Sequence, residues 1–329
     1  MTFYFTLQLE KSKIELTHKQ GELKMKNNLL SSLAFIIILF FIIINFDVIN
    51  KYVLNIITPP KEIITLGEKN EYYRNYDFTF VQNTKNFYPT NQQEILNIYY
   101  TAINAGKISF TFNCSDEYKT CLDDVKNLAN NQTKLSHINN FVHPYNSFKH
   151  IETEYNNLGE VTITIKKNYT AELIQEINNK IDYIETNILD KNTNLETNIK
   201  LAHDYIINNS KYDSQRSDHN IINYKSDIAY GPLLEGYGIC GGYTDAMMLV
   251  LERLNIPSYK ISSETHVWNA ININNTWYHL DLTWDDPVTS TNTNLLEHNF
   301  FLINTTKLSQ LEQEEHTFDQ TVYSELKEA

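Results

Sequence analysis

Residues 236–287 read GYGICGGYTDAMMLVLERLNIPSYKISSETHVWNAININNTWYHLDLTWDDP, and their pattern is the strongest indication of the protein's architecture. Glycines flank Cys240, so the chain can turn sharply there and a substrate can approach closely. From Tyr243 to Pro257 apolar residues recur at three- and four-residue intervals, which predicts a helix with Cys240 in its first turn. The helix dipole and backbone N–H groups at that position favour thiolate over thiol. A cysteine that merely packs would not need such backbone freedom.

The second half of the same stretch predicts a β-hairpin. Its strands, 266–273 and 276–281, flank Asn274-Asn275, a pair that tolerates the positive φ of a two-residue turn. In that register His266 and Asp281 are diagonal neighbours on one face, about 7–8 Å apart between backbones. Trp268 shares their face. The opposite face is predicted to be the core side, and it carries Val267, Ile271, Ile273, Tyr278 and Leu280.

Cys240, His266 and Asp281 are together suited to nucleophilic acyl chemistry. Cys240 would attack a carbonyl, His266 would take and return the proton, and Asp281 would fix the imidazole tautomer. Each residue also has an ordinary structural interpretation: a packed cysteine, a satisfied histidine and a strand-end turn aspartate. All three together favour a cysteine enzyme.

The segments GYGICGGYTDAMMLVLERLNIPSYKI, HVWNAININNTWYHLDLTWDDP and EHNFFLI resemble the transglutaminase-like superfamily over about residues 195–305. Its pattern is a G-x-C-x-G-[YF] helix start, an H-x-W-N strand and a W-Y-x-x-D-x-T-W-D strand end. The matching residues are Cys240, Gly242, Tyr243, His266, Trp268, Asn269, Trp277, Tyr278, Asp281, Thr283, Trp284 and Asp285. The resemblance implies an α+β, papain-type core in which the cysteine helix packs on an antiparallel sheet. Members include cross-linkers, peptidases, amidases and inactive domains.

Other residues are candidates for supporting the site. An oxyanion hole needs a donor beside the Cys240 backbone N–H, and Tyr230 and Tyr237 are the candidates; both could equally be packing residues. Gly241, Trp268 and Asn269 complete the predicted surroundings. A turn role is favoured for Asp285 and Asp286, a supporting role is open to His279, and His298 and His316 are interpreted as structural. No zinc signature, phosphate-binding loop or dinucleotide fingerprint appears, so no metal or cofactor is predicted.

An apolar run near the N-terminus predicts the location. Residues 29–49 are long enough to span a bilayer, and Lys24 and Lys26 precede them. We therefore expect a cytoplasmic segment over residues 1–28 and a single-pass anchor, with the catalytic part outside the cell. Met25 is a possible true start. A cleaved signal peptide is the alternative, but no small-residue cleavage motif follows.

The charge and the cysteine content limit the classes of binding partner and the disulfides that we expect. The formal charge of −13 and the pI near 5.2 argue against nucleic acid. Three cysteines are present. Cys114 and Cys121 could pair outside the cell and leave Cys240 free, but two turns of helix between them would separate them by about 10 Å, too far for a disulfide. The pairing stays open at this point.

The predicted organisation has four parts after the anchor: a linker over 50–70, a small α+β domain of unknown role over 71–168, the catalytic domain with its leading helices over 169–308, and an acidic tail over 309–329. In the small domain we expect a helix capped by Thr90 with Gln93. The expected strands lie at 77–80, 107–112, 148–155 and 161–166, and further helices near 115–129 and 134–142.

The sequence thus predicts a membrane-anchored, extracytoplasmic bacterial cysteine enzyme that forms a thioester from an amide of a protein or peptide, which could be a cell-wall peptide. Hydrolysis is slightly favoured over transamidation. The alternative is a non-catalytic surface protein that uses the same fold to bind wall peptides.

Overall fold

The computed structural model describes residues 25–26, 28, 30–46, 48–49, 63–288, 295–312 and 314–327. The chain divides into two compact units, residues 1–63 and 64–329. In the first unit residues 30–44 are helical. Within the described residues, no helix is long and apolar enough to cross a membrane. The segment predicted before residue 25 and the linker residues 50–62 lie outside the described residues, and the predicted anchor stays a prediction.

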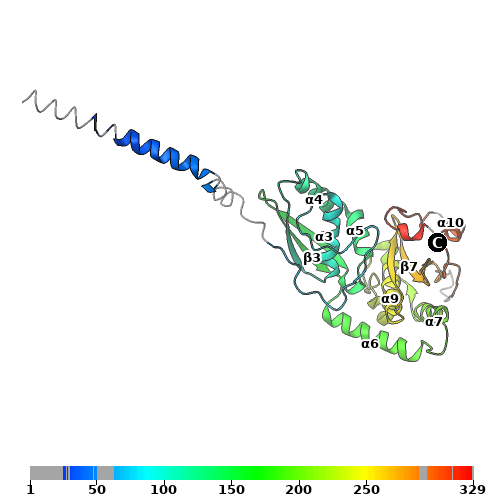
Figure 1. Ribbon diagram of the computed structural model, residues 1–329. Coiled ribbons are helices and arrows are strands. Elements are labelled where there is room, and N and C mark those ends of the chain that lie inside the picture. The colour runs from blue at the N-terminus through cyan, green and yellow to red at the C-terminus, as the bar shows by residue number, and fades with distance from the viewer. Residues whose placement is uncertain are drawn as a thin grey trace, which may run out of the picture. The chain divides into compact units, whose positions relative to one another are not determined.

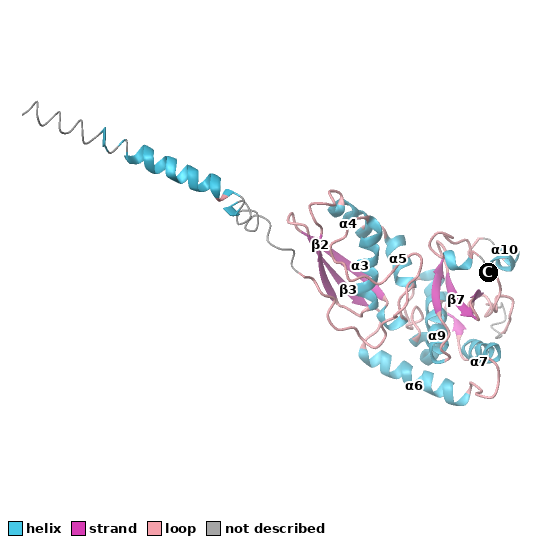
Figure 2. Cartoon of the chain, viewed as in Figure 1, coloured by secondary structure: helices cyan, strands magenta, loops and turns pink. Residues whose placement is uncertain are grey.

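The N-terminal part of the second unit is a three-stranded antiparallel sheet in the order β1-β3-β2, with helices beside it (Figures 1 and 2). The strands are β1 (Ser109–Asn113), β2 (Phe148–Tyr155) and β3 (Glu160–Lys167), and the helices are α3 (Gln92–Asn104), α4 (Cys121–Ala129) and α5 (Gln132–Asn140). A short 3-10 turn, η1 (Pro144–Asn146), leads into β2. These strands correspond to the predicted strands at 107–112, 148–155 and 161–166, and β3 buries alternate residues.

Two local predictions are wrong in this region. Residues 77–80 form no strand. Asn91, not Thr90, caps α3: its side chain accepts from the Glu94 backbone N–H, and the Glu94 carboxylate accepts in return from the Thr90 backbone N–H at 2.8 Å. The reciprocal cap therefore involves Glu94 instead of Gln93, because asparagine caps a helix as well as threonine does.

Cys114 and Cys121 form a disulfide with Cα atoms 5.7 Å apart. Cys114 follows β1, and Cys121 is the first residue of α4, so the two residues are not separated by turns of helix. The helix begins later than the predicted start at 115, which removes the geometric objection. Cys240 is left as the free cysteine.

The rest of the second unit carries the residues of the predicted catalytic core. Its helices are α6 (Ala171–Asn187), α7 (Leu195–Asn208), α8 (Ser214–His219) and α9 (Cys240–Arg253), with a π-helical turn η2 (Gly231–Glu235) before α9. The strands β6 (Ser258–Ser262), β7 (Val267–Ile273) and β8 (Thr276–Leu280) form an antiparallel sheet, and β4 (Lys211–Tyr212) pairs with β5 (Tyr237–Gly238). The apolar residues Ile177, Ile181 and Ile184 of α6 are buried inside the unit.

The predicted hairpin register is confirmed. Ile273 pairs with Thr276 and Asn269 with Leu280. Asn274 and Asn275 have φ values of 54° and 66°, the conformation that a two-residue turn between twisted strands requires.

No break in packing marks the predicted domain boundary near residue 168. One hydrophobic cluster joins the first sheet and its helices to β6, β7 and the C-terminal segment. The Arg74 guanidinium donates to the carbonyl of Ser258 at 2.8 Å, which also bridges the two regions.

The segment after Leu308 is not a loose tail. After α10 (Thr305–Leu311) and up to η3 (Ser324–Leu326), the residues Val322, Tyr323 and Leu326 are buried. The Tyr323 hydroxyl accepts from the Asn140 side chain at 2.7 Å and from the Ser262 backbone N–H at 3.1 Å. The acidic composition of the segment conceals these apolar anchors, which is why a surface tail was expected.

Candidate active site

Cys240 is the first residue of α9 and is partly exposed. The glycines around it serve close packing of neighbouring backbone. A Cβ on Gly242 would lie 2.2 Å from the carbonyl oxygen of Ser226, and one on Gly241 would lie 2.9 Å from that of Asp227. The segment 226–228 therefore runs directly against the start of the helix, and only residues without side chains fit there.

His266 and Asp281 form a buried pair at the mouth of the hairpin. His266 Nε2 lies 2.6 Å from Asp281 Oδ2. The other carboxylate oxygen accepts the backbone N–H groups of Thr283 and Trp284 at 2.8 and 3.3 Å. The His266 ring stacks on Trp268, with centroids 5.7 Å apart. The imidazole is thus held both at one nitrogen and along one face.

The surroundings favour the protonated form of His266. Burial alone would lower the pKa of His266, but the charge and hydrogen bond of Asp281 and a hydrogen bond with the Cys240 thiol raise that pKa to about 10. For Asp281 burial acts to raise the pKa, yet His266 and His316 hold it well below its ordinary value. A cationic imidazole beside a thiol is the arrangement that stabilises a thiolate.

The cysteine helix packs on the predicted core side of the hairpin. α9 packs on the face of β7 that carries Asn269 and Ile271, where the Asn269 side chain donates to the Thr244 carbonyl at 3.1 Å. The Thr244 hydroxyl donates in turn to the carbonyl of Val267 at 3.1 Å. His266, which contacts the Cys240 thiol, is the residue just before β7. Both faces of the ribbon are covered, because the C-terminal segment packs on Trp268.

His316, interpreted from the sequence as a structural residue, lies in the site. Its Nε2 is 2.9 Å from Asp281 Oδ2, the same oxygen that His266 contacts, and its Nδ1 is 2.9 Å from Glu312 Oε2. Phe300 stacks on the ring with centroids 5.1 Å apart. No spacing signal connects residue 316 to the hairpin, since the contact exists only through the tertiary placement of the C-terminal segment.

The two tyrosines predicted as oxyanion donors have other partners. The Tyr230 hydroxyl donates to Glu176 at 2.7 Å, and the Tyr237 ring stacks on Tyr224. Among the residues that the structure describes, neither hydroxyl is hydrogen-bonded to Cys240, His266 or Asp281. Tyr212 is a further residue near the thiol that the sequence did not predict. Burial raises the pKa of Tyr212, its hydroxyl donates to Ser217, and the charge of Cys240 adds to the rise in pKa.

The remaining candidate residues contact side chains and backbone next to the triad. His279 Nδ1 accepts the Trp268 indole N–H at 2.9 Å, which fixes the ring that stacks on His266. Asp285 and Asp286 do more than form a turn. Asp285 is fully buried and accepts the Phe300 backbone N–H at 3.0 Å, whereas Asp286 accepts the hydroxyl of Tyr243. Burial raises the pKa of Asp286 to about 6.

Two solved structures are similar to parts of this chain. One, described as a TGase, is 14% identical with a TM-score of 0.32 over 42% of this chain and 45% of its own. The other, described as a candidate cysteine protease from Cytophaga hutchinsonii, is 15% identical with a TM-score of 0.27 over 45% of this chain and 65% of its own. No family model matches the sequence, and no curated protein matches it.

The chain spans less than two thirds of the length of either structure. The chain itself has a mixed helix and sheet architecture. With TM-scores below 0.5 these likenesses carry no argument for activity, so function is argued from the side chains of the site.

Two groups of described side chains have atoms close enough together to hold a metal ion. One is His266, Asp281 and His316, in which the carboxylate oxygens already accept from two histidines and two backbone N–H groups. The other is His203, Asp204 and His298, which lies outside the predicted site.

Proposed function

We propose that this protein is a cysteine enzyme that cleaves amide bonds of proteins or peptides through a thioester on Cys240. The observation that carries the proposal is the alignment of a partly exposed thiol at a helix start, a buried histidine with a raised pKa, and a carboxylate held by four donors. Each group has the partner that its role in acyl transfer requires.

The proposed reaction runs in two halves. The Cys240 thiolate attacks the amide carbon, and as the tetrahedral intermediate collapses the C–N bond breaks while the His266 imidazolium protonates the leaving amine. Water then attacks the thioester, His266 takes a proton from it, and the C–S bond breaks to release the acid. A second amine in place of water would give transamidation. We favour hydrolysis because no recognisable amine-binding group lies in the sequence around the triad.

We also propose that His316 positions the catalytic carboxylate. Asp281 accepts from two backbone N–H groups on one oxygen and from two histidines on the other, so every acceptor direction is used. Glu312 orients the His316 ring from the other side. A carboxylate held in this way loses little freedom when the imidazole of His266 moves between its proton partners.

We propose that the enzyme is anchored in the membrane by residues 29–49, with its catalytic part outside the cytoplasm. Support comes from the apolar run and the preceding lysines, and from the Cys114–Cys121 disulfide, since such bonds persist mainly in oxidising compartments. The region 71–168 would then hold or present the substrate beside the catalytic core.

Iodoacetamide alkylation of the full-length protein in detergent tests the proposal, because Cys240 is the free thiol. An ordinary thiol ionises near pH 8.5, so we expect rapid alkylation at about pH 6 only in a protein with an activated thiolate. The substitution His266→Ala should slow this reaction roughly tenfold or more. His150→Ala, which removes an exposed histidine on β2, is the matched control and should have no effect.

Alkylation at the rate of an ordinary thiol in both the wild type and His266→Ala would remove the enzyme proposal and favour the non-catalytic binding protein. Once activation is established, formation of a new peptide carboxylate indicates hydrolysis, and incorporation of a fluorescent primary amine indicates transamidation, because the leaving amine is released in both reactions.

A further inference from the structure

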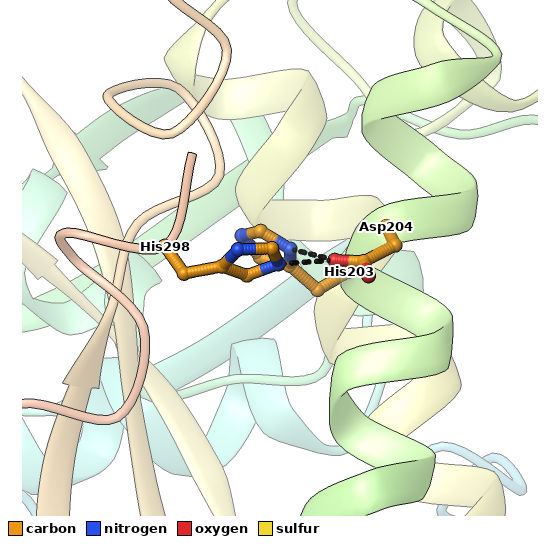
Figure 3. Close-up of side chains that lie close together, drawn as sticks. All are labelled: His203, Asp204 and His298. Atoms are coloured by element: carbon orange, nitrogen blue, oxygen red, sulfur yellow. Dashed lines mark hydrogen bonds and ion pairs between the residues drawn. The ribbon is translucent and has the colours of Figure 1, made fainter. Parts of the chain in front are cut away.

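A second group of titratable side chains lies outside the triad, between α7 and the segment that follows residue 295. His203 and Asp204 come from α7 and His298 from that segment, and Figure 3 shows both imidazoles close to the carboxylate. His203 Nδ1 lies 2.9 Å and His298 Nε2 2.7 Å from the same oxygen, Asp204 Oδ1. Two imidazoles and a carboxylate are donors that transition metals prefer.

Hydrogen bonds alone do not satisfy His298. Its Nε2 lies 2.7 Å from Asp204 Oδ1 and also 2.7 Å from Lys200 Nζ. An imidazole nitrogen carries either a proton or a lone pair, so it can donate to the carboxylate or accept from the ammonium group, but not both. One of the two short contacts is therefore unfavourable without a further group.

The contacts of the buried His203 ring also favour a bound cation. Its Nδ1 faces Asp204 and its Nε2 lies 3.2 Å from Asp285 Oδ2, so two carboxylates face one ring that is fully buried. A neutral imidazole can supply a proton to only one of them. If Nδ1 binds a cation, Nε2–H is free to donate to Asp285, which is the carboxylate–histidine–metal arrangement common in metalloproteins.

We propose that His203 Nδ1, Asp204 Oδ1 and His298 Nε2 bind a divalent transition-metal ion of the zinc class. Two nitrogen donors disfavour calcium and magnesium, which prefer oxygen. The side chains of Asp204 and His298 are 25% and 33% exposed, which leaves room for water as a fourth ligand. Lys200, with 46% of its side chain exposed, competes with the ion and moves into solvent when the ion binds.

The site is connected to the segment that bears the catalytic aspartate. Asp285 contacts His203 and also accepts the Phe300 backbone N–H, and its own backbone N–H donates to the carbonyl of Asp281. A bound ion would therefore stabilise the contacts that join Asp285 to Asp281 and Phe300, without entering the reaction at Cys240.

Cobalt(II) titration of the full-length Cys240→Ser protein tests the proposal, since removing the thiol leaves nitrogen and oxygen ligands only. We expect one equivalent to bind with visible absorption bands and to be displaced by zinc. Asp204→Asn and His298→Gln should each weaken binding tenfold or more, and Lys200→Met should tighten it several-fold. His316→Gln should leave the stoichiometry unchanged, which separates this group from the histidines beside Asp281.

Each variant is checked for folding by its circular dichroism and thermal midpoint without metal. The partly exposed His298 keeps the test informative if Asp204→Asn fails to fold. Full binding in both Asp204→Asn and His298→Gln, or the absence of saturable binding in Cys240→Ser, would overturn the proposal and leave an ion-pair network. Neither outcome bears on the alkylation of Cys240.

Discussion

At Asp281 one carboxylate meets donors from four residues: the backbone N–H groups of Thr283 and Trp284 on one oxygen, and the rings of His266 and His316 on the other. The chemistry of the site depends on how these four donors are divided between the two oxygens. His266 draws its raised pKa from Asp281, and His316 shares the same oxygen from the opposite side. Glu312 contacts the other ring nitrogen of His316 and thereby fixes how this ring meets Asp281.

Replacing His316 with glutamine should therefore move the pH profile of Cys240 alkylation. Glutamine can still donate to Asp281 but cannot hold Glu312 at the same time as the imidazole ring does. A less firmly held carboxylate supports the His266 imidazolium less well, so the pH of half-maximal alkylation should rise by about one unit. The measurement is the alkylation rate between pH 5 and 9, with His150→Gln as the matched control. A lowered thermal midpoint with an unmoved profile would mean that His316 only packs.

The direction of the pH dependence of amide cleavage follows from the contacts of His266. Its pKa is raised to about 10, so the imidazolium form persists through neutral pH, and amide cleavage that needs a proton from His266 should decline only as the pH rises through that value.

At this scale the sequence predicted Cys240, His266 and Asp281 from spacing, because all three lie within one local stretch. It could not predict His316, whose contact depends on where a distant segment folds.

At the scale of elements, the start of α9 is determined by what packs against it. Its glycines allow the backbone of residues 226–228 to approach the first turn, and the hairpin turn at Asn274 and Asn275 sets which residues face the helix. The turn and its register could be predicted because they depend on neighbouring residues. The packing of segment 226–228 could not, since nothing in its sequence specifies the helix it meets.

Gly242→Ala should destabilise the protein by about 1–3 kcal/mol, the usual cost of overpacking. The new Cβ would lie 2.2 Å from a backbone oxygen, which cannot move as a flexible side chain could. Urea unfolding measures the change. Ser136→Ala, at an exposed position of α5, provides the control. An unchanged unfolding midpoint in Gly242→Ala would show that the contact with Ser226 relaxes without cost.

At the scale of the second unit, the C-terminal segment joins regions that the sequence suggested were separate. Tyr323 is buried between α5 and β6, with hydrogen bonds to Asn140 and Ser262. The sequence indicated β1, β2, β3 and the hairpin of β7 and β8 through their patterns, together with several helices, but it did not indicate β4, β5 or β6. It did not indicate that they share a core, because an aromatic residue within an acidic stretch gives no local sign of its partners.

Tyr323→Ala should therefore cost about 3–5 kcal/mol, as expected for removal of a large buried ring. Tyr323→Phe keeps the ring and should cost about 1–3 kcal/mol, because buried donors then lose their acceptor. Chemical denaturation of both variants gives the comparison. Equal effects of the two substitutions would mean that the hydroxyl, and not the packing of the ring, joins the segment to the core.

The position of His316 in the chain also determines when the proposed site is completed. Synthesis produces Cys240, His266 and Asp281 before the residues that carry His316 and Glu312. Until those residues emerge and fold, the carboxylate lacks one of its two histidine donors. A chain still being made therefore contains the nucleophile without its full support, and the proposed enzyme would gain full activity only late in its own biosynthesis.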